Sequence, residues 1–345
     1  MPLESAQELL LDKRAAAARV RDRLPDELLD AAGNDRRQMV FDVEMHLAFL
    51  GESLRLEAPR LFAEYASWTS QLLTTAGGDV ADVVRCFDAM EHELRESGTG
   101  GWVDDAAATL QVAREQVRGR VPVTQSHLRD DNVHRDAASA FLAACLRLRR
   151  TQALAIVHDL VAQGATVQEI YLDVLTPVMH ELGRKWHLNH ITVGQEHYCT
   201  AVAQMVMAQL FPLVFDAERE PIGRVVAVCV AGEVHEIGAR MVADFFEMEG
   251  WDTYFLGANT PVDSILQTVA DRNADILALS ATMTFHVEIV KEIIDSLRQK
   301  GAGKTRVLVG GYPFNLSEGL WQRVGADGFA PDAEGALLAA RQIMA

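Results

Sequence analysis

The sequence predicts a chain in two parts: an all-α part, followed by an α/β part built on a doubly wound parallel sheet. Apolar residues recur at helical spacing up to about residue 215. After the charged linker 216–221, short apolar runs alternate with helical patterns, which is typical of a parallel sheet covered by helices. The 345 residues exceed one ordinary domain. We therefore expect an N-terminal helical bundle over 1–125, a four-helix domain over 132–215 and a flavodoxin-like α/β domain over 222–345.

The first domain is predicted to be a bundle of four or five helices. Pro59 is a favoured first-turn residue, and a helical stripe follows it, formed by Leu61, Tyr65, Trp68 and Leu72. After a turn at Gly77 and Gly78 comes a second stripe, formed by Val80, Val83, Val84, Phe87 and Met90. Asp35 is placed to cap an earlier helix that carries Met45 and Leu50, and another helix is expected from Asp104.

The middle domain is punctuated by glycines that leave helices of ordinary length. A polar stretch over 122–131 separates it from the bundle as a linker. One amphipathic stripe is clear, and it consists of Val167, Ile170, Tyr171, Val174 and Val178. In the last domain, buried parallel strands are expected at 225–230, 253–256, 276–280, 307–309 and weakly at 328–329. The helices between them are expected at 237–249, 262–272, 287–299 and near Leu320.

Composition narrows the class of protein. The net charge of −17 repels phosphate backbones and argues against nucleic-acid binding by this chain. The four cysteines are far apart and form no CxxC pair, which favours a reducing compartment over a disulfide or zinc-thiolate framework. The start lacks the features of a signal peptide, and no apolar run reaches the ~18 residues of a membrane span. We expect a cytoplasmic protein with no membrane partner.

The residues that carry chemistry gather where predicted strands end. Glu233, His235 and Gly238 follow the first strand, so the histidine is expected to face the ligand crevice beyond the carboxyl ends of the strands. The competing interpretation is an ordinary loop histidine beside a capping glutamate. Two further features favour a ligand, because each follows another strand at the same edge. They are the hydroxyl pair Ser280 and Thr282, and the glycine pair Gly310 and Gly311.

This trio resembles the cobalamin-binding fold, whose signature is Asp-x-His-x-x-Gly, then Ser-x-Leu, then Gly-Gly. The chain departs from it twice, with Glu233 for the aspartate and Thr282 for the leucine. The resemblance implies that His235 displaces the dimethylbenzimidazole base and ligates cobalt from below, with Glu233 bonded to its imidazole. It also implies that Gly238 and the residues after the third and fourth strands bind the cofactor. Ser280, Thr282, Gly310 and Gly311 would line the slot for the nucleotide tail.

The middle domain carries a second resemblance. Trp186 followed by Glu196 and His197 matches the Trp-x9-Glu-His pattern of the CarH and LitR light-dependent cobalamin regulators. This resemblance, over about 137–345, implies a four-helix cap above adenosylcobalamin. Trp186 would pack on the adenosyl group, and Glu196 and His197 would hold it. His187 would become the upper cobalt ligand once light has broken the cobalt–carbon bond. A zinc site formed by His187, His190, Glu196 and His197 is the alternative, although no HExxH motif supports it.

The N-terminal part lacks the basic winged helix that precedes this module in those regulators. A related group, the photocobilins, adds a linear tetrapyrrole such as biliverdin to the same module. The chain resembles the members of this group, because a helical bundle replaces the regulator head. The bundle aromatics, with His46, His92 or Trp102, are either ordinary core or part of a bilin site. Cys86 offers a thiol for a thioether, although a cysteine on a helical stripe is usually core.

The hypothesis from sequence is a sensor and not an enzyme. Light would remove the adenosyl group, the cap would shift, and contacts within a homodimer or homotetramer or with an unknown effector protein would change. The alternative is a corrinoid carrier subunit of a methyltransferase system, which has a similar cap over a similar domain. A third motif is rejected: Gly301 to Thr305 resembles part of a P-loop, but it precedes a strand and lacks the first glycine.

Overall fold

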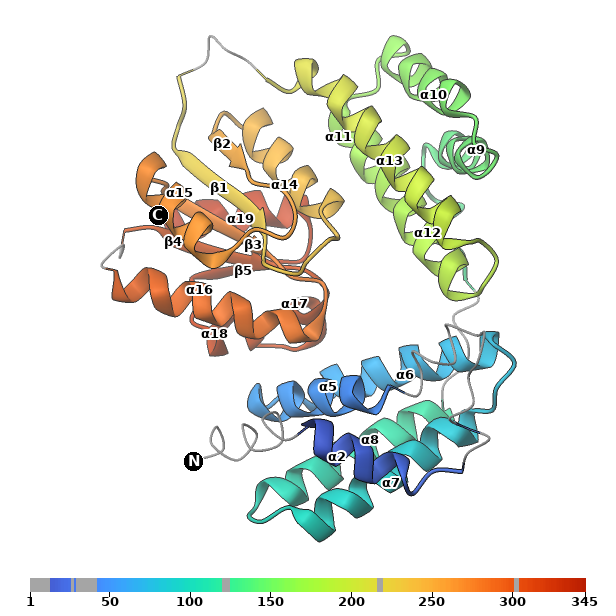
Figure 1. The fold of residues 1–345 in the computed structure, drawn as a ribbon. Coiled ribbons are helices and arrows are strands. Elements are labelled where there is room, and N and C mark those ends of the chain that lie inside the picture. The colour runs from blue at the N-terminus through green and yellow to red at the C-terminus, as the bar shows by residue number, and fades with distance from the viewer. Residues whose placement is uncertain (1–12, 26–27, 29–41, 120–124, 216–219, 301–303) are drawn as a thin grey trace. The chain divides into compact units, whose positions relative to one another are not determined.

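The computed structural model describes residues 13–25, 28, 42–119, 125–215, 220–300 and 304–345 (Figure 1). Its contacts divide the chain into two compact units. One comprises Met1–Val123, Thr282–Lys291 and Tyr312–Val324, and the other comprises Thr124–Ala281, Glu292–Gly311 and Gly325–Ala345. The three predicted domain ranges stay predictions. Asp35 and residues 301–303 of the P-loop-like phrase lie outside the described residues.

The N-terminal part is helical, as the stripes predict. Its described helices are α2 (Lys13–Arg21), α5 (Val43–Arg55), α6 (Pro59–Thr75), α7 (Val80–Ser97) and α8 (Trp102–Gly119). Pro59 opens α6, and Asp79 caps α7 by accepting the Ala81 N–H. The cap of α5 is Asp42, whose side chain accepts the Met45 N–H. Helix α8 begins two residues before the predicted Asp104.

The bundle aromatics form its core. Phe62, Phe87 and His46 are fully buried, and Tyr65 is 7% exposed. The His46 ring nitrogen Nδ1 lies 2.7 Å from the Tyr65 hydroxyl, so this buried polar pair satisfies its own hydrogen bond. Burial raises the pKa of the Cys86 thiol to about 12, which leaves it protonated and unreactive at neutral pH. These contacts fit the core interpretation of the aromatics.

The middle segment consists of helices that pack on one apolar cluster. They are α9 (Arg135–Leu146), α10 (Arg150–Ala162), the continuous run α11 (Val167–Glu169), η1 (Ile170–Leu175) and α12 (Thr176–His187), and α13 (Val193–Leu210). This is the four-helix arrangement expected from the glycine spacing. The sequence did not reveal that η1 is a π-helix. Such an insertion re-aims side chains within a helix and is frequent at functional sites.

The π-helix joins the helical part to the α/β part of the same unit. The Tyr171 hydroxyl donates to Asp244 Oδ2 at 2.6 Å, and both side chains are buried. Burial raises the pKa of both the hydroxyl and the carboxyl. Because a buried polar group that loses its partner is costly, this contact fixes how the two parts pack.

The last segment is a five-stranded sheet in which all strands run parallel. Its strands are β1 (Arg224–Cys229), β2 (Asp252–Phe255), β3 (Ile276–Ser280), β4 (Arg306–Gly310) and β5 (Gly328–Ala330), in the order β2-β1-β3-β4-β5. The parallel sheet and the positions of its strands confirm the prediction. The helices that follow the strands are α14 (Ile237–Met248), α15 (Val262–Arg272), α16 (Val287–Gln299), α17 (Tyr312–Leu316), α18 (Leu320–Arg323) and α19 (Ala333–Met344). Helices α14 and α19 pack against each other on one face of the sheet, over a cluster that contains Phe246 and Trp251 (Figure 1).

This strand order places a topological switch between β1 and β3. From β1 the chain continues to β2 on one side, and it later returns to β3 on the other. The loops after β1 and β3 therefore diverge and leave a crevice at the carboxyl edge, where ligands of such sheets bind. None of the described helices is long and apolar enough to span a membrane.

A buried carboxylate anchors the segment that leads into α9. Glu181 is 2% exposed, and it accepts hydrogen bonds from the His127 backbone N–H at 3.0 Å and from Arg184 at 2.6 Å. Burial pushes the pKa of Glu181 upward, but the bonds from Arg184 and His127 outweigh it and lower that pKa to about 2.

We expect Glu181→Gln to lower the free energy of unfolding at pH 7 by roughly 2 kcal/mol. A carboxyl group whose pKa is depressed by folding stabilises the protein above its unfolded value of 4.5, and this stabilisation is lost as the pH falls toward about 2. The difference between wild type and variant should therefore shrink from pH 7 to pH 3 in urea unfolding. Glu115→Gln, at an exposed position of α8, is the control and should change little. A difference that does not depend on pH would contradict the role given to the charge.

Candidate functional site

His235 lies in the loop between β1 and α14, where the switch in strand order predicts a ligand. Its Nδ1 lies 2.6 Å from Glu233 Oε1, and its backbone N–H donates to the same oxygen at 2.9 Å. The His235 side chain is 60% exposed, while that of Glu233 is fully buried. The carboxylate therefore fixes the ring from the protein side and leaves Nε2 available to a ligand.

The surroundings of His235 favour a proton on the ring in the absence of a metal. The hydrogen bond to Glu233 raises the pKa of His235 most, burial acts in the opposite direction, and the charges of Glu233 and Glu196 raise it further. Glu196 belongs to α13, so a negative charge of the helical part also acts on the pKa of His235. In a metal complex the same carboxylate would make the imidazole a stronger donor.

The loop that carries His235 is held by a residue that sequence reasoning missed. Asn259, two residues beyond Gly257, accepts the Gly232 N–H through its side chain at 2.8 Å and donates its own N–H to the Glu233 carbonyl at 2.9 Å. Its φ of 52° is left-handed, a conformation that asparagine tolerates better than most residues. The signal in the sequence was the Gly-Ala-Asn-Thr-Pro turn after the second strand.

Of the residues predicted to line the slot for the nucleotide tail, all but Thr282 lie at the carboxyl edge of the sheet. Register pairs Cys229 with Ser280 and Ser280 with Gly310, so these positions lie side by side at the carboxyl ends of β1, β3 and β4. Gly311 follows directly. Thr282 belongs to the other compact unit and is placed here by its sequence position only. The sheet therefore brings together Ser280, Gly310 and Gly311.

A side chain would collide with the backbone at Gly311 and crowd it at Gly310, but it would meet no atom at Gly238. At Gly311, with φ of 108°, a Cβ would lie 2.0 Å from the Ala281 carbonyl oxygen, so the backbone itself requires glycine. At Gly310 a Cβ would approach the Ala330 carbonyl oxygen to 3.1 Å. Gly238, the second residue of α14, has no atom within 4 Å of a Cβ and leaves open space beside the His235 loop.

The predicted upper residues flank the turn between α12 and α13. Trp186 and His187 end α12, and Trp186 packs on the apolar cluster of the helical part. The two ring nitrogens of His187 are buried. A capping box at Thr192 starts α13 and places Glu196 and His197 in its first turns, where Glu196 Oε2 lies 2.6 Å from His197 Nδ1.

Hydrogen bonds tie this helical part to the loop of His235. Gln204 of α13 donates to Glu236 Oε1 at 2.6 Å, directly beside the histidine. Together with the Tyr171 contact, this bond holds the upper residues and His235 in one unit. The zinc alternative gains no support, because the described residues contain no group of three or more histidine, cysteine or acidic side chains placed to hold a metal.

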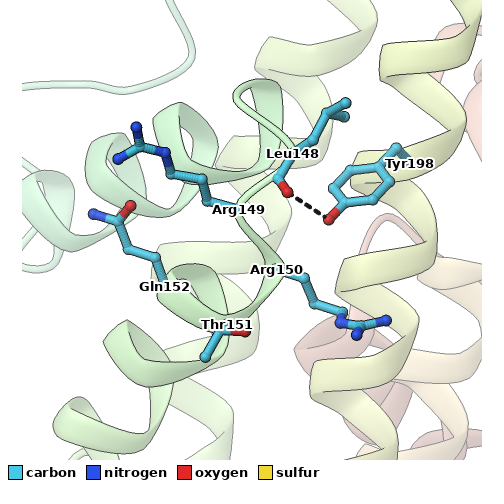
Figure 2. A pocket seen from close by; sticks show the side chains of 6 residues that line it. All are labelled: Leu148, Arg149, Arg150, Thr151, Gln152 and Tyr198. Atoms are coloured by element: carbon cyan, nitrogen blue, oxygen red, sulfur yellow. Dashed lines mark hydrogen bonds between the residues drawn. The ribbon is translucent and has the colours of Figure 1, made fainter.

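A shallow cavity of about 540 Å³ lies elsewhere in the helical part (Figure 2). Its lining is Leu148, Arg149, Arg150, Thr151, Gln152 and Tyr198, and the Tyr198 hydroxyl donates to the Leu148 carbonyl at 3.1 Å. Glu196 and Tyr198 are two residues apart on α13 and so project from opposite sides of it. None of the predicted site residues lines this cavity.

The residues at the sheet edge fit a corrinoid. An exposed imidazole held by a buried carboxylate supplies an axial ligand for cobalt, and the open space at Gly238 leaves room beside it. Four free, buried cysteines offer no competing thiolate centre, and burial raises the pKa of the nearby Cys229 thiol to about 12.

Comparison with known proteins agrees with this fit. Residues 223–341 and residues 137–211 each match a model described as a B12 binding domain. The dimethylamine corrinoid protein of Methanosarcina barkeri is 27% identical over 209 residues, which are 59% of this chain and 94% of that protein. A corrinoid protein of Desulfitobacterium hafniense is 31% identical over 130 residues, 37% of this chain and 59% of that protein.

A solved structure shows the same fold. The monomethylamine corrinoid protein of Methanosarcina barkeri aligns with a TM-score of 0.54 at 21% identity, covering 61% of this chain and all of that one. At that identity the likeness speaks for the fold alone.

These relatives correct the functional prediction. The interpretation as a light sensor of the CarH and LitR type, or as a bilin-binding photocobilin, is wrong, because the relatives are methylamine corrinoid proteins. The cause of the error is that the Trp-x9-Glu-His pattern samples only three positions, while the helical part that carries them and the α/β part both match general B12-binding models. The coarser conclusion holds: residues 137–211 and 223–341 form a corrinoid-binding module.

Proposed function

We propose that this chain is the corrinoid carrier of a methyltransferase system and that it acts with a separate methyltransferase partner. The observation that carries the proposal is the match to the dimethylamine corrinoid protein over 94% of its length. Two B12-binding models also match this chain, over residues 137–211 and 223–341. The methylamine names of the relatives favour a methylated amine as the methyl source. When bound, the corrinoid supplies a cobalt that accepts a methyl group from one partner and yields it to another.

The residues of this chain hold and shield the cofactor. His235 would supply its Nε2 as a ligand for the cobalt, and Glu233 would orient the ring and hold its proton at Nδ1. Ser280, Gly310 and Gly311 would border the tail of the cofactor at the edge of the sheet, and Thr282 lies two residues after Ser280 in the sequence.

The upper face of the corrinoid belongs to the helical part. Trp186, His187, Glu196 and His197 would border the bound cofactor on that side. The hydrogen bond from Gln204 to Glu236 would help to hold α13 beside the loop of His235 when the cofactor is bound. Self-association as a dimer or tetramer remains part of the proposal.

The test uses the full chain reconstituted with hydroxocobalamin and reduced with titanium(III) citrate. We expect stoichiometric binding, a change in the absorption spectrum on addition of methyl iodide, and the same change with dimethylamine plus the dimethylamine methyltransferase of Methanosarcina barkeri. Bound corrinoid that neither methyl donor converts would contradict the carrier function, while leaving corrinoid binding established. Omission of the methyltransferase is the control for the amine-dependent reaction.

A further inference from the structure

The N-terminal bundle contacts a segment that lies far away in the sequence. The unit built on the bundle also contains 282–291, which is the segment after β3, and 312–324, which is the segment after β4. Met283 packs against the apolar cluster of the bundle, and α17 contacts α6. The bundle therefore takes hold of the chain just after two of the strands that end at the candidate corrinoid site.

An aromatic contact anchors the first of these segments. Phe285 packs edge-on against Phe49 of α5, with ring centroids 5.4 Å apart and planes at 79°. Phe49 is only 3% exposed and stacks on Tyr65 at 3.7 Å, and Tyr65 is bonded to the buried His46. Phe285 thus rests on the most constrained part of the bundle.

An ion pair anchors the same segment nearly two turns further along α5. The Arg55 guanidinium is 6% exposed and is paired with Glu52 on its own helix and with Glu288 at the start of α16. An arginine this well shielded loses much of its hydration, so removal of either carboxylate partner is costly. Phe49 and Arg55, six residues apart on α5, both hold the segment 282–291.

The held segment continues directly into the corrinoid-binding part. Met283 is three residues after Ser280, and Tyr312 follows Gly311. Helix α16 begins with residues of the bundle unit and continues into residues of the other unit, so the held segment is continuous in sequence with that unit. Displacement of 282–291 therefore changes the direction in which the chain leaves Ser280.

We infer that Phe49 and Arg55 are positioning residues for corrinoid binding: α5 holds the segment after β3 in the conformation that receives the cofactor. This inference rests on the proposed corrinoid site. Thermodynamic linkage makes the coupling reciprocal, so bound corrinoid stabilises the packing of α5 to the same extent. The local stability of α5 in the bundle then depends on whether the corrinoid is bound.

The test compares Arg55→Met with Arg114→Met in the full chain. The two arginines are a matched pair: both lie in the bundle, both are nearly buried at 6% and 12%, and both pair with two carboxylates. They differ because the partners of Arg114, Asp88 and Glu91, are in α7, while one partner of Arg55 is on the held segment. We expect Arg55→Met to weaken hydroxocobalamin binding about 5- to 10-fold and Arg114→Met to leave it unchanged.

A charge-preserving and a partner variant separate positioning from loss of folding. Arg55→Lys should recover most of the affinity, and Glu288→Gln should weaken binding as Arg55→Met does. The double variant should be no weaker than either single one, because both remove the same contact. Additive losses, or equal losses in the Arg55 and Arg114 variants, would overturn the inference. If Arg55→Met does not fold, Glu288→Gln carries the same comparison.

Hydrogen exchange on the wild type tests the reciprocal effect. Hydroxocobalamin should slow exchange in α5 by about 5- to 10-fold and leave α7 unchanged. Corrinoid binding without protection of α5 would overturn the coupling and leave the carrier proposal intact. Absence of corrinoid binding would overturn both.

Discussion

His235→Ala should weaken corrinoid binding by roughly 100-fold or more, since removal of a supporting partner alone typically costs 10–100-fold. The His235 side chain is 60% exposed and is held by a fully buried carboxylate, so its loss removes an imidazole that is already oriented for ligation. We would measure the affinity by spectroscopic titration with hydroxocobalamin. The nitrogen coupling of a protein imidazole in the electron paramagnetic resonance spectrum of the reduced, bound corrinoid should also disappear.

Two companion variants make this prediction specific. Glu233→Gln keeps a hydrogen-bond acceptor but removes the charge, and an intermediate loss of about 10-fold is expected. His158→Ala removes an exposed histidine of α10 that is bonded to Gln209, and binding should not change. Retention of the imidazole coupling in His235→Ala would exclude His235 as the lower ligand and would direct attention to another histidine.

Gly311→Ala should destabilise the protein by roughly 3 kcal/mol even without corrinoid. A Cβ there would lie 2.0 Å from the Ala281 carbonyl oxygen and 2.8 Å from its carbon, on a backbone with φ of 108°. Neither the strand end nor the backbone of Ala281 can move without disturbing the sheet. Urea unfolding of the cofactor-free protein measures the effect directly.

The control for this prediction is Gly183→Ala. Gly183 lies within α12, and a Cβ there meets no atom within 4 Å, so the higher helix propensity of alanine should stabilise the protein by up to about 1 kcal/mol. A Gly311→Ala variant with wild-type stability but no corrinoid binding would show that the glycine serves the ligand and not the sheet.

The coupling of the bundle to the segment after β3 bears on how a carrier meets its partners. A methyl carrier must expose its cofactor to a methyltransferase and then cover it again. If α5 holds the receiving segment, a less stable packing of the bundle lowers the affinity for the corrinoid, and a stable packing maintains that affinity. Under the proposed coupling, the bundle contributes to the retention of the corrinoid.

The sequence by itself determined the elements and the position of the candidate ligand, His235. Runs such as Val225–Cys229 are buried throughout and are β-branched or small, so they can form only interior strands of a parallel sheet. Pro59 and the spacing of Leu61 and Tyr65 determined α6 in the same local way. His235 was found because the end of a parallel strand is a fixed place in this fold.

Tertiary structure decided what no local pattern encodes. The π-helix with Tyr171 exists because its hydroxyl reaches Asp244, which is 73 residues away. The bonds of Asn259 to the His235 loop and the contact of Phe49 with Phe285 likewise join residues that are distant in the chain. Helical and strand periods report only which side of an element is buried, and not against what it is buried. For the same reason, the short cap pattern at Trp186 identified a cofactor class but misassigned the function.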